Sequence, residues 1–348
     1  MELTIVGAGA IGGVVGAHLA RAGHRVVLVD GDREHVAAIR RHGLEVGGLA
    51  EMVVAVAACE PRELQGPLGT VLLAVKTPDT LAALAPVVPL LAPDGCVVSM
   101  QNGLEESRIA ARVGPERTVA ACLTFGGFYE RPGRVVYSGP GTLRVGELDG
   151  RLTSRVETLA RVLSDFHPAA ATTNIHGFRW GKLILGTIYF ATAAVDADVV
   201  DILRDRAARR VLAGLAAEAL GVALALGIVV EPIDGFDGRV FESGPATETP
   251  AARAAWDAQI VYWERGVARR TGIWRDLAVR RRRTEAGPIL GALLDAAGRA
   301  GRPVPRVRAL LALLEDLEAG RRRPDWTNLT ELDRAAAVAP APEARQGR

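Results

Sequence analysis

The GAGAIG motif at residues 7–12 constrains this chain more than any other segment, because of what stands on each side of it. The apolar run 3–6 has the length of a short buried strand, and a helical pattern follows the motif to about residue 22. Glycines at this spacing allow a tight turn close to a pyrophosphate, and the third lets the helix pack on the sheet. The motif therefore predicts a dinucleotide site formed by Gly7, Gly9, Ala10, Ile11 and Gly12.

An acidic residue ends the next β-type run, RVVLVD at 25–30. Asp30 stands 18 residues after Gly12. A carboxylate at this place accepts hydrogen bonds from the adenosine ribose hydroxyls and repels a 2′-phosphate. Arg33 is near enough to contact such a phosphate, although an arginine at a helix start is more often solvated. The pattern predicts NAD(P)H as the cofactor, with NADH favoured by Asp30.

Short β-type runs alternate with helical ones through the first half of the chain, at 25–30, 51–58, 70–75 and 96–100. This alternation predicts a parallel sheet covered by helices on both faces. The segments 118–128, 134–137 and 142–146 are predicted as hairpin strands that close the sheet. After about residue 152 the periodicity becomes helical throughout. We therefore expect an α/β N-terminal Rossmann-type doubly wound sheet at 1–150, an all-α domain at 151–334 and a disordered tail at 335–348.

Composition excludes several classes of protein. With 42 basic and 40 acidic residues the formal net charge is only +2, which argues against a nucleic-acid partner. The three cysteines lack CxxC spacing, so neither a disulfide framework nor a zinc site is predicted, and no metal is expected. No run approaches the roughly 20 apolar residues of a membrane helix, and no basic region precedes the first apolar run. A cytoplasmic protein that acts on a small molecule is expected, without a membrane partner.

Arginine supplies 40 of the 42 basic residues, and the two lysines are Lys76 and Lys182. A strong bias toward arginine codons explains most of this. A lysine that persists in such a chain indicates a place where a guanidinium cannot replace a compact amine that releases a proton.

Four further motifs follow the glycine motif in order: LLAVKT around Lys76, SMQNGL around Asn102, RWGKL around Lys182 and RRTEAGPILG around Glu285. Together with GAGAIG they make the chain resemble the ketopantoate reductase (2-dehydropantoate 2-reductase) family over roughly residues 1–320. The resemblance implies a Rossmann domain, a helical domain and a cleft between them where a nicotinamide reduces a 2-oxo acid to a 2-hydroxy acid. It also implies a homodimer.

The resemblance assigns a role to each motif residue. Lys182 would be the general acid that stabilises and protonates the developing oxyanion. Glu285 would contact the substrate and share in the acid network. Lys76 would lie near both cofactor and substrate, and Asn102 would donate to the substrate carbonyl or hold the nicotinamide ribose.

The substrate-binding residues differ from the family's pattern. Family members carry asparagines four and eight residues after the catalytic lysine, and here these positions are Gly186 and Phe190. Both belong to the predicted substrate site and share a helix face with Lys182. The family's serine falls near residues 272–273 and is absent, and the acid after the glutamate is replaced by Gly287. An apolar pocket scarcely rewards a substrate hydroxyl, so ketopantoate itself should gain little here.

Two alternatives remain open from the sequence. One is a reductase of imine or opine type that reduces C=N on the same scaffold. The other is a non-catalytic dinucleotide-binding protein, against which the presence of both Lys182 and Glu285 argues.

Overall fold

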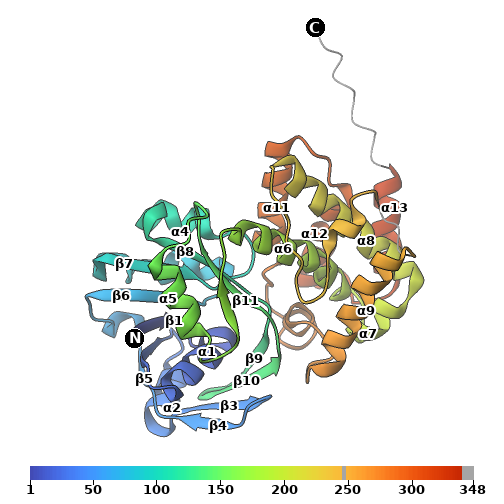
Figure 1. The fold of residues 1–348 in the computed structure, drawn as a ribbon. Coiled ribbons are helices and arrows are strands. Elements are labelled where there is room, and N and C mark those ends of the chain that lie inside the picture. The colour runs from blue at the N-terminus through green and yellow to red at the C-terminus, as the bar shows by residue number, and fades with distance from the viewer. Residues whose placement is uncertain (245–247, 339–348) are drawn as a thin grey trace. The chain divides into compact units, whose positions relative to one another are not determined.

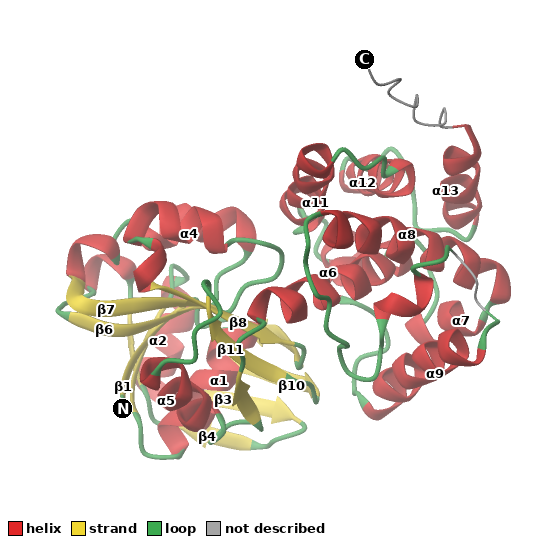
Figure 2. Ribbon diagram, turned by 45° about the horizontal axis from the view of Figure 1, so that its top comes forward, coloured by secondary structure: helices red, strands yellow, loops and turns green. Residues whose placement is uncertain are grey.

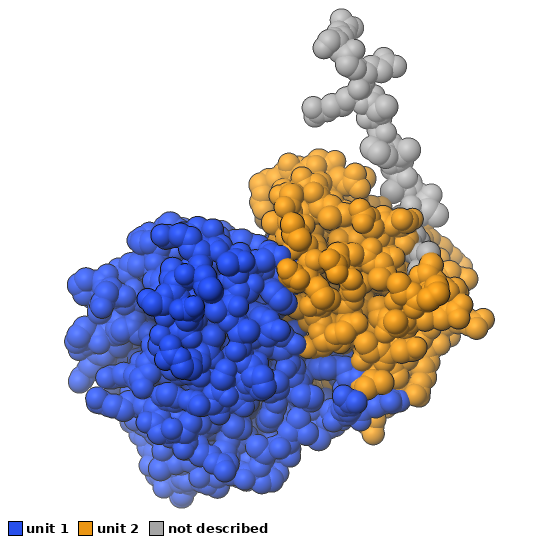
Figure 3. Space-filling view, viewed as in Figure 1, with its two compact units in different colours: residues 1–179, 262–268 blue, residues 180–261, 269–348 orange. Residues whose placement is uncertain are grey.

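The computed structural model describes residues 1–244 and 248–338, and it divides into two compact units (Figure 3). Unit 1 is Met1–Arg179 with Tyr262–Ala268, and unit 2 is Trp180–Val261 with Arg269–Arg348. This division differs from the boundary expected after residue 150, because the first helix and a strand that follow that residue pack onto unit 1. Of the expected tail at 335–348, residues 335–338 continue a helix, and 339–348 lie outside the described residues.

Unit 1 contains an eight-stranded sheet in the order β12-β11-β8-β7-β6-β1-β2-β5 (Figures 1 and 2). Every neighbouring pair is parallel except β11 with β8. The doubly wound Rossmann-type sheet predicted from the sequence is confirmed. The strands are β1 Glu2–Val6, β2 Arg25–Val29, β5 Ala57–Cys59, β6 Leu68–Leu73, β7 Leu91–Ser99, β8 Thr118–Leu123, β11 Leu143–Glu147 and β12 Ala169–Ala171.

Alternate residues of the central strands feed two apolar cores, one on each face of the sheet. Ile5 and Leu72 join a core with side chains of α1, α2 and α5, whereas Val6 and Leu73 join a core with side chains of α3 and α4. Helices therefore cover both faces. They are α1 Ala10–Arg21, α2 Arg33–His42, α3 Thr80–Leu84, α4 Glu106–Val113 and α5 Ser154–Leu163.

A second, four-stranded sheet in unit 1 was not predicted. Its order is β4-β3-β10-β9, with β3 Leu44–Gly48, β4 Met52–Val54, β9 Gly126–Arg131 and β10 Arg134–Gly139. The predicted run 51–58 is thus wrong as one strand, because it divides between β4 here and β5 in the large sheet. The predicted strand 118–128 is wrong in the same way. Its first six residues are fully buried in the large sheet as β8, whereas residues 126–128 are half-exposed in β9.

Unit 2 is helical, as predicted (Figure 2). The helical stretch between residues 199 and 225 is divided because Asp205 begins a new helix, accepting a hydrogen bond from Ala208 N at 2.7 Å. Phe236, Phe241 and Trp256 pack together in the interior of this unit. The helices are α6 Ile175–Thr192, α7 Val199–Arg204, α8 Arg206–Ala225, α9 Pro250–Arg265, α10 Gly272–Trp274, α11 Ala286–Ala300, α12 Pro305–Glu318 and α13 Thr327–Val338; the start of α6 and the end of α9 belong to unit 1. Within the described residues, no helix combines the length and apolar character needed to span a membrane.

The register of the large sheet aligns four strand ends. Val6 of β1 pairs with Val29 of β2 and with Leu73 of β6, and Leu73 pairs with Ser99 of β7. These four residues form one row across β7-β6-β1-β2, and the chain leaves the sheet after each of them at the same edge. Ligands of open α/β sheets bind outside this carboxyl edge, where the strand order reverses, as it does here beside β1.

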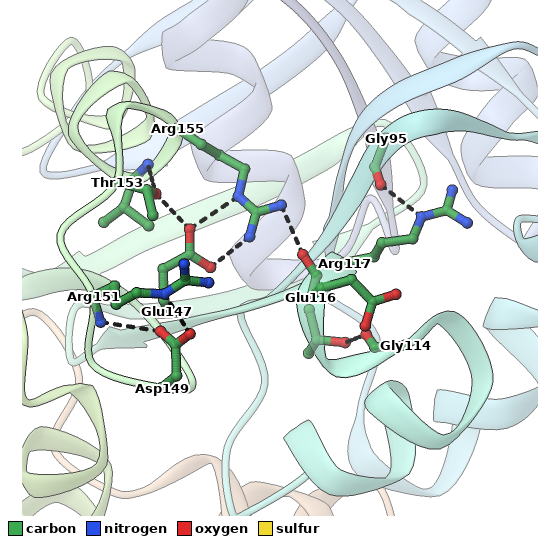
Figure 4. A network of polar contacts seen from close by, with 11 residues as sticks. Gly95, Gly114, Glu116, Arg117, Glu147, Asp149, Arg151, Thr153 and Arg155 are labelled. Carbon is green, nitrogen blue, oxygen red and sulfur yellow. Dashed lines mark hydrogen bonds and ion pairs between the residues drawn. The ribbon is translucent and has the colours of Figure 1, made fainter.

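A network of hydrogen bonds and ion pairs lies at the edge of the large sheet opposite to this carboxyl edge (Figure 4). Glu147 at the end of β11 accepts hydrogen bonds from Arg155 Nε, at 3.0 Å, and from the Thr153 hydroxyl at the start of α5. Arg155 also donates to the carbonyl oxygen of Glu116, which precedes β8. Because β11 runs antiparallel to β8, this network lies at the amino end of β8.

Candidate functional site

The three glycines of the motif differ in what surrounds them. Gly7 directly follows β1 with φ +96°, and a Cβ on it would lie 2.8 Å from Val75 N. A Cβ on Gly12 would collide with the Gly7 carbonyl oxygen, so that close approach of helix to strand requires glycine. Gly9, at the N-cap of α1, has φ −72°, and a Cβ on it would meet nothing within 4 Å. Close packing therefore explains why residues 7 and 12 are glycines. The space beside Gly9 is open.

The peptide of Ala8, inside the motif, is held from both sides. Its N–H donates to Asp30 Oδ2 at 2.8 Å, and its carbonyl oxygen lies 2.9 Å from His35 Nε2. His35 is 1% exposed, and its Nδ1 accepts from Gly133 N at 2.9 Å, so Nε2 carries the proton donated to Ala8. The end of β2 and the first turn of α2 thus fix the glycine turn. His35 thus has a structural role.

Asp30 has a second hydrogen bond, from Asp32 N to Oδ1 at 2.9 Å. Each carboxylate oxygen holds two lone pairs, so both oxygens retain an acceptor position for a ribose hydroxyl. Arg33, the predicted competitor for a 2′-phosphate, lies 3.2 Å from Glu60 Oε2 with its side chain 71% exposed. Because the Arg33 side chain is exposed, this ion pair is weak, and it turns Arg33 toward a carboxylate. Nearby, burial and a hydrogen bond to Asp32 raise the pKa of the Tyr129 hydroxyl.

Lys76 and Asn102 follow the neighbouring strands at the same edge. Lys76 is half-buried three residues after Leu73, and Asn102 is exposed three residues after Ser99. Because Leu73 and Ser99 are paired, the two site residues follow adjacent strands by the same number of residues. The structure therefore brings Gly7, Asp30, Lys76 and Asn102 to one edge of four adjacent strands.

The residues at this edge fit a dinucleotide. The open space at Gly9 admits a phosphate against the start of α1, whose first turn carries no acidic side chain. Backbone N–H groups at a helix start, together with the helix dipole, favour an anion there. Asp30 supplies the carboxylate for the ribose. No group of three or more possible metal-ligating side chains occurs in the part of the chain that the structure describes.

In unit 2, α6 presents a row of partly accessible residues. Lys182, Gly186 and Tyr189 are half-buried while the residues beside them are buried, and they follow one another at four and three positions. A Cβ on Gly186 would meet nothing within 4 Å. Phe190, by contrast, is only 6% exposed. The Tyr189 hydroxyl donates to Gln259 Oε1 of α9, and Gln259 Nε2 donates to the Asp234 carbonyl oxygen at 3.0 Å, which fixes the ring.

Glu285 occupies the N-cap position of α11 and is 9% exposed. Its side chain makes no cap hydrogen bond; instead Thr284 Oγ1 accepts from Ala286 N at 3.0 Å. Glu318 Oε1 in turn accepts from Thr284 N at 2.9 Å and from its hydroxyl at 2.6 Å. Thr284 and Glu318 thus fix the backbone at Glu285. Sequence reasoning missed this pair, since 34 residues separate its members.

Two family models match the chain. The model described as ketopantoate reductase PanE/ApbA matches residues 3–150, and its C-terminal counterpart matches residues 174–318. A curated 2-dehydropantoate 2-reductase from Mesorhizobium japonicum is 28% identical, over 92% of this chain and 99% of the relative. One from Archaeoglobus fulgidus is 32% identical over 53% of this chain and 60% of the relative.

Solved structures agree with these matches. A crystal structure of a PanE/ApbA family ketopantoate reductase from Ralstonia eutropha JMP134 has a TM-score of 0.76 at 28% identity, covering 92% of this chain and 99% of that chain. The ternary structure of D-mandelate dehydrogenase with NADH and anilino(oxo)acetate has a TM-score of 0.79 at 22% identity, with the same coverages. The second likeness concerns the fold alone.

Alanine in place of Gly9 should mainly weaken NADH binding, whereas alanine in place of Gly7 should mainly destabilise the fold. A Cβ at residue 9 meets nothing within 4 Å, so Gly9→Ala should lower the free energy of unfolding less than Gly7→Ala does. NADH binding should weaken about tenfold or more, because the methyl group occupies the phosphate space. Gly7→Ala should destabilise the fold by about 2–4 kcal/mol, because φ is positive and the Cβ meets backbone. Thermal melts and NADH titrations measure both, and unchanged NADH binding by Gly9→Ala would contradict the assignment.

Proposed function

The chain belongs to the ketopantoate reductase family, and we propose that it reduces a 2-oxo acid to a 2-hydroxy acid with NAD(P)H. Membership makes it an NAD(P)-dependent oxidoreductase that acts on a keto group. The observation that carries the proposal is the set of aligned strand ends. This edge of the sheet carries Gly7, Asp30, Lys76 and Asn102, and the open space at Gly9 lies at the same edge.

When bound, the reduced nicotinamide supplies a hydride to the keto carbon. The carbonyl electron pair then moves onto oxygen, and Lys182 neutralises the negative charge that develops there. The Nζ ammonium stabilises the developing oxyanion and gives it a proton, which completes the alcohol. A guanidinium would offer the charge without the proton, since it does not deprotonate near neutral pH.

The remaining site residues bind and orient. We propose that Glu285 accepts a hydrogen bond from the substrate and takes part in the proton network. Thr284 fixes the backbone beside it at the start of α11. Lys76 contacts cofactor and substrate. Asn102, exposed in its turn, donates to the substrate carbonyl or holds the nicotinamide ribose.

NADH is the proposed cofactor rather than NADPH. Asp30 stands at the end of β2 with acceptor positions toward a ribose, and Arg33 faces Glu60. A 2′-phosphate placed beside Asp30 would be repelled. Use of NADH by a protein of this fold has a precedent in the D-mandelate dehydrogenase structures, which contain it.

The substrate is proposed to be a 2-oxo acid with a bulky apolar or aromatic group. Gly186 leaves room one turn after Lys182, where the family holds an amide, and the Tyr189 ring lies beyond it on the same row. Phe190 offers an apolar side chain in place of a second amide, from a more buried position. The anilino(oxo)acetate bound by D-mandelate dehydrogenase also joins an aromatic group to an oxo acid.

We further propose a homodimer, as in the ketopantoate reductase from Staphylococcus aureus described as dimeric, which has a TM-score of 0.70 to this chain. A cytoplasmic location stays a prediction from composition.

The cofactor prediction compares NADH with NADPH. Wild-type kcat/KM should be higher with NADH, and Asp30→Ala should narrow the ratio about tenfold, because repulsion of the 2′-phosphate is lost. The ratio is the proper measure, since Asp30 also holds the Ala8 peptide and its loss weakens both cofactors. Glu60→Gln is the matched variant, because it frees Arg33 and leaves Asp30 intact. Equal use of the two cofactors by the wild type would contradict the prediction.

The catalytic prediction concerns Lys182. Lys182→Ala should lower kcat by roughly 10²–10⁴, the range for loss of a positioned acid, while the NADH dissociation constant stays nearly unchanged. Lys182→Arg should recover little of that loss, because it restores charge without a transferable proton. Normal kcat in the alanine variant would show that the proton comes from another group.

The substrate prediction concerns the space at Gly186. Wild-type kcat/KM should favour ketopantoate over 3-methyl-2-oxobutanoate only weakly, and phenylpyruvate should be reduced, since an apolar site scarcely rewards a hydroxyl. Gly186→Asn, which has room, should raise the relative rate with ketopantoate, whereas Gly186→Ala should not. A wild-type preference for ketopantoate above about 10³, roughly 4 kcal/mol, would mean that other residues recognise the hydroxyl.

The same assay separates the two alternatives from the proposal. Each 2-oxo acid is tested alone and with an amine, and faster NADH oxidation with the amine present would assign the enzyme to C=N reduction. Binding of NADH without oxidation by any acid would support a non-catalytic role.

A further inference from the structure

Arg179, near the start of α6, contacts three carbonyl oxygens and one carboxylate, and the proposed reduction does not use it. It is 3% exposed. Nη1 donates to the carbonyl oxygens of Gln101 and Ala121, each at 2.8 Å, and Nη2 donates to the Gly103 carbonyl oxygen at 2.6 Å. Nη2 also lies 2.5 Å from Glu106 Oε1, a carboxylate that is itself buried. The guanidinium thereby joins β8, the first turn of α4 and the turn after β7.

Two of these acceptors stand on either side of Asn102. The carbonyls of Gln101 and Gly103 are its neighbours in the chain, and both point to the same guanidinium. Gly103 has φ +77°, so the turn takes a tight form there. The backbone on both sides of Asn102 is thus held from inside the unit while the Asn102 side chain is exposed.

The Gln101 side chain extends the connection to the neighbouring strand. Its Nε2 donates to the Val75 carbonyl oxygen at 3.0 Å and to the Thr80 hydroxyl at 2.8 Å. Val75 directly precedes Lys76. A continuous path of hydrogen bonds therefore joins Arg179 to the turn of Asn102 and, through Gln101, to the peptide beside Lys76.

On its other side, Arg179 lies three residues before Lys182 in the same continuous helix. From this geometry we infer that Arg179, with Glu106 as its counter-ion, is a positioning residue for the proposed reduction. It sets the backbone of the turn that carries Asn102 in unit 1. The inference rests on the proposed function. A lysine cannot replace Arg179, because one ammonium lacks the planar fork that reaches several carbonyls.

A double-mutant cycle of Arg179→Lys with Asn102→Ala tests the inference. If Arg179 acts through Asn102, Arg179→Lys alone should lower kcat/KM about 10- to 100-fold, mainly in kcat. In the Asn102→Ala background the same change should cost less than about threefold, because the positioned group is already gone. The inference is overturned if the double variant loses kcat/KM by the product of the two single losses. Such a result would mean that Arg179→Lys damages the protein independently of Asn102.

The control is Arg155→Lys, which disturbs an arginine paired with buried Glu147 in the same unit, at the opposite sheet edge (Figure 4). Arg155→Lys should lower the melting temperature by about as much as Arg179→Lys does, and it should leave kcat/KM nearly unchanged. An equal loss of kcat/KM in Arg155→Lys would also overturn the inference. Should Arg179→Lys fail to fold, Glu106→Gln takes its place in the cycle with the same expectation of non-multiplying effects.

The cycle is also measured by the dissociation constant of NADH, which keeps its outcome separate from that of the proposed function. If the wild type reduces no 2-oxo acid, the proposed function fails. The positioning inference then stands if Arg179→Lys and Asn102→Ala each weaken NADH binding and their effects do not multiply. It fails if Arg179→Lys leaves NADH binding unchanged.

Discussion

The pairing of four parallel strands in one register is the constraint on which the site in unit 1 depends. Val29, Val6, Leu73 and Ser99 form one row, so the segments after them leave the sheet together. A shift of one residue in any strand would exchange its two apolar faces, which the cores above and below the sheet forbid. Core packing therefore fixes the positions of polar residues that take no part in the core. The glycine turn, Asp30, Lys76 and Asn102 are placed by Val, Leu and Ile side chains.

Much of unit 1 could be predicted from the sequence because its signals are local. The strand, glycine turn and helix at residues 2–21 follow one another, and each limits the conformation of the next. The acid at the end of β2 occurs at a fixed distance from the motif. The second sheet could not be predicted in this way. Its strands β3 and β10 lie almost 90 residues apart in sequence, and strands of five or six residues carry little periodicity of their own.

The boundary between the units escaped prediction for a related reason. Sequence analysis finds boundaries through linkers rich in proline, glycine and polar residues, but the division falls inside α6, between Arg179 and Trp180. The residues that support the site were missed because their partners are backbone carbonyls or distant side chains. Arg179 contacts carbonyls 76 and 78 residues away, and Thr284 contacts Glu318. Such contacts leave no pattern in one sequence, whereas the residues they support carry recognisable motifs.

The structure also explains what the abundant arginines do and why two lysines stand apart from them. Arg179 holds three carbonyls and a carboxylate, and Arg155 holds Glu147 and a carbonyl. In the run at 280–283, Arg280 and Arg282 both pair with buried Asp276. Each of these tasks uses the fixed fork of a guanidinium, which makes several bonds and keeps its proton. Lys76 and Lys182 are half-buried positions where the chain has an amine instead. An amine makes fewer fixed bonds and can give up a proton, and that is the property the proposed reduction requires at Lys182.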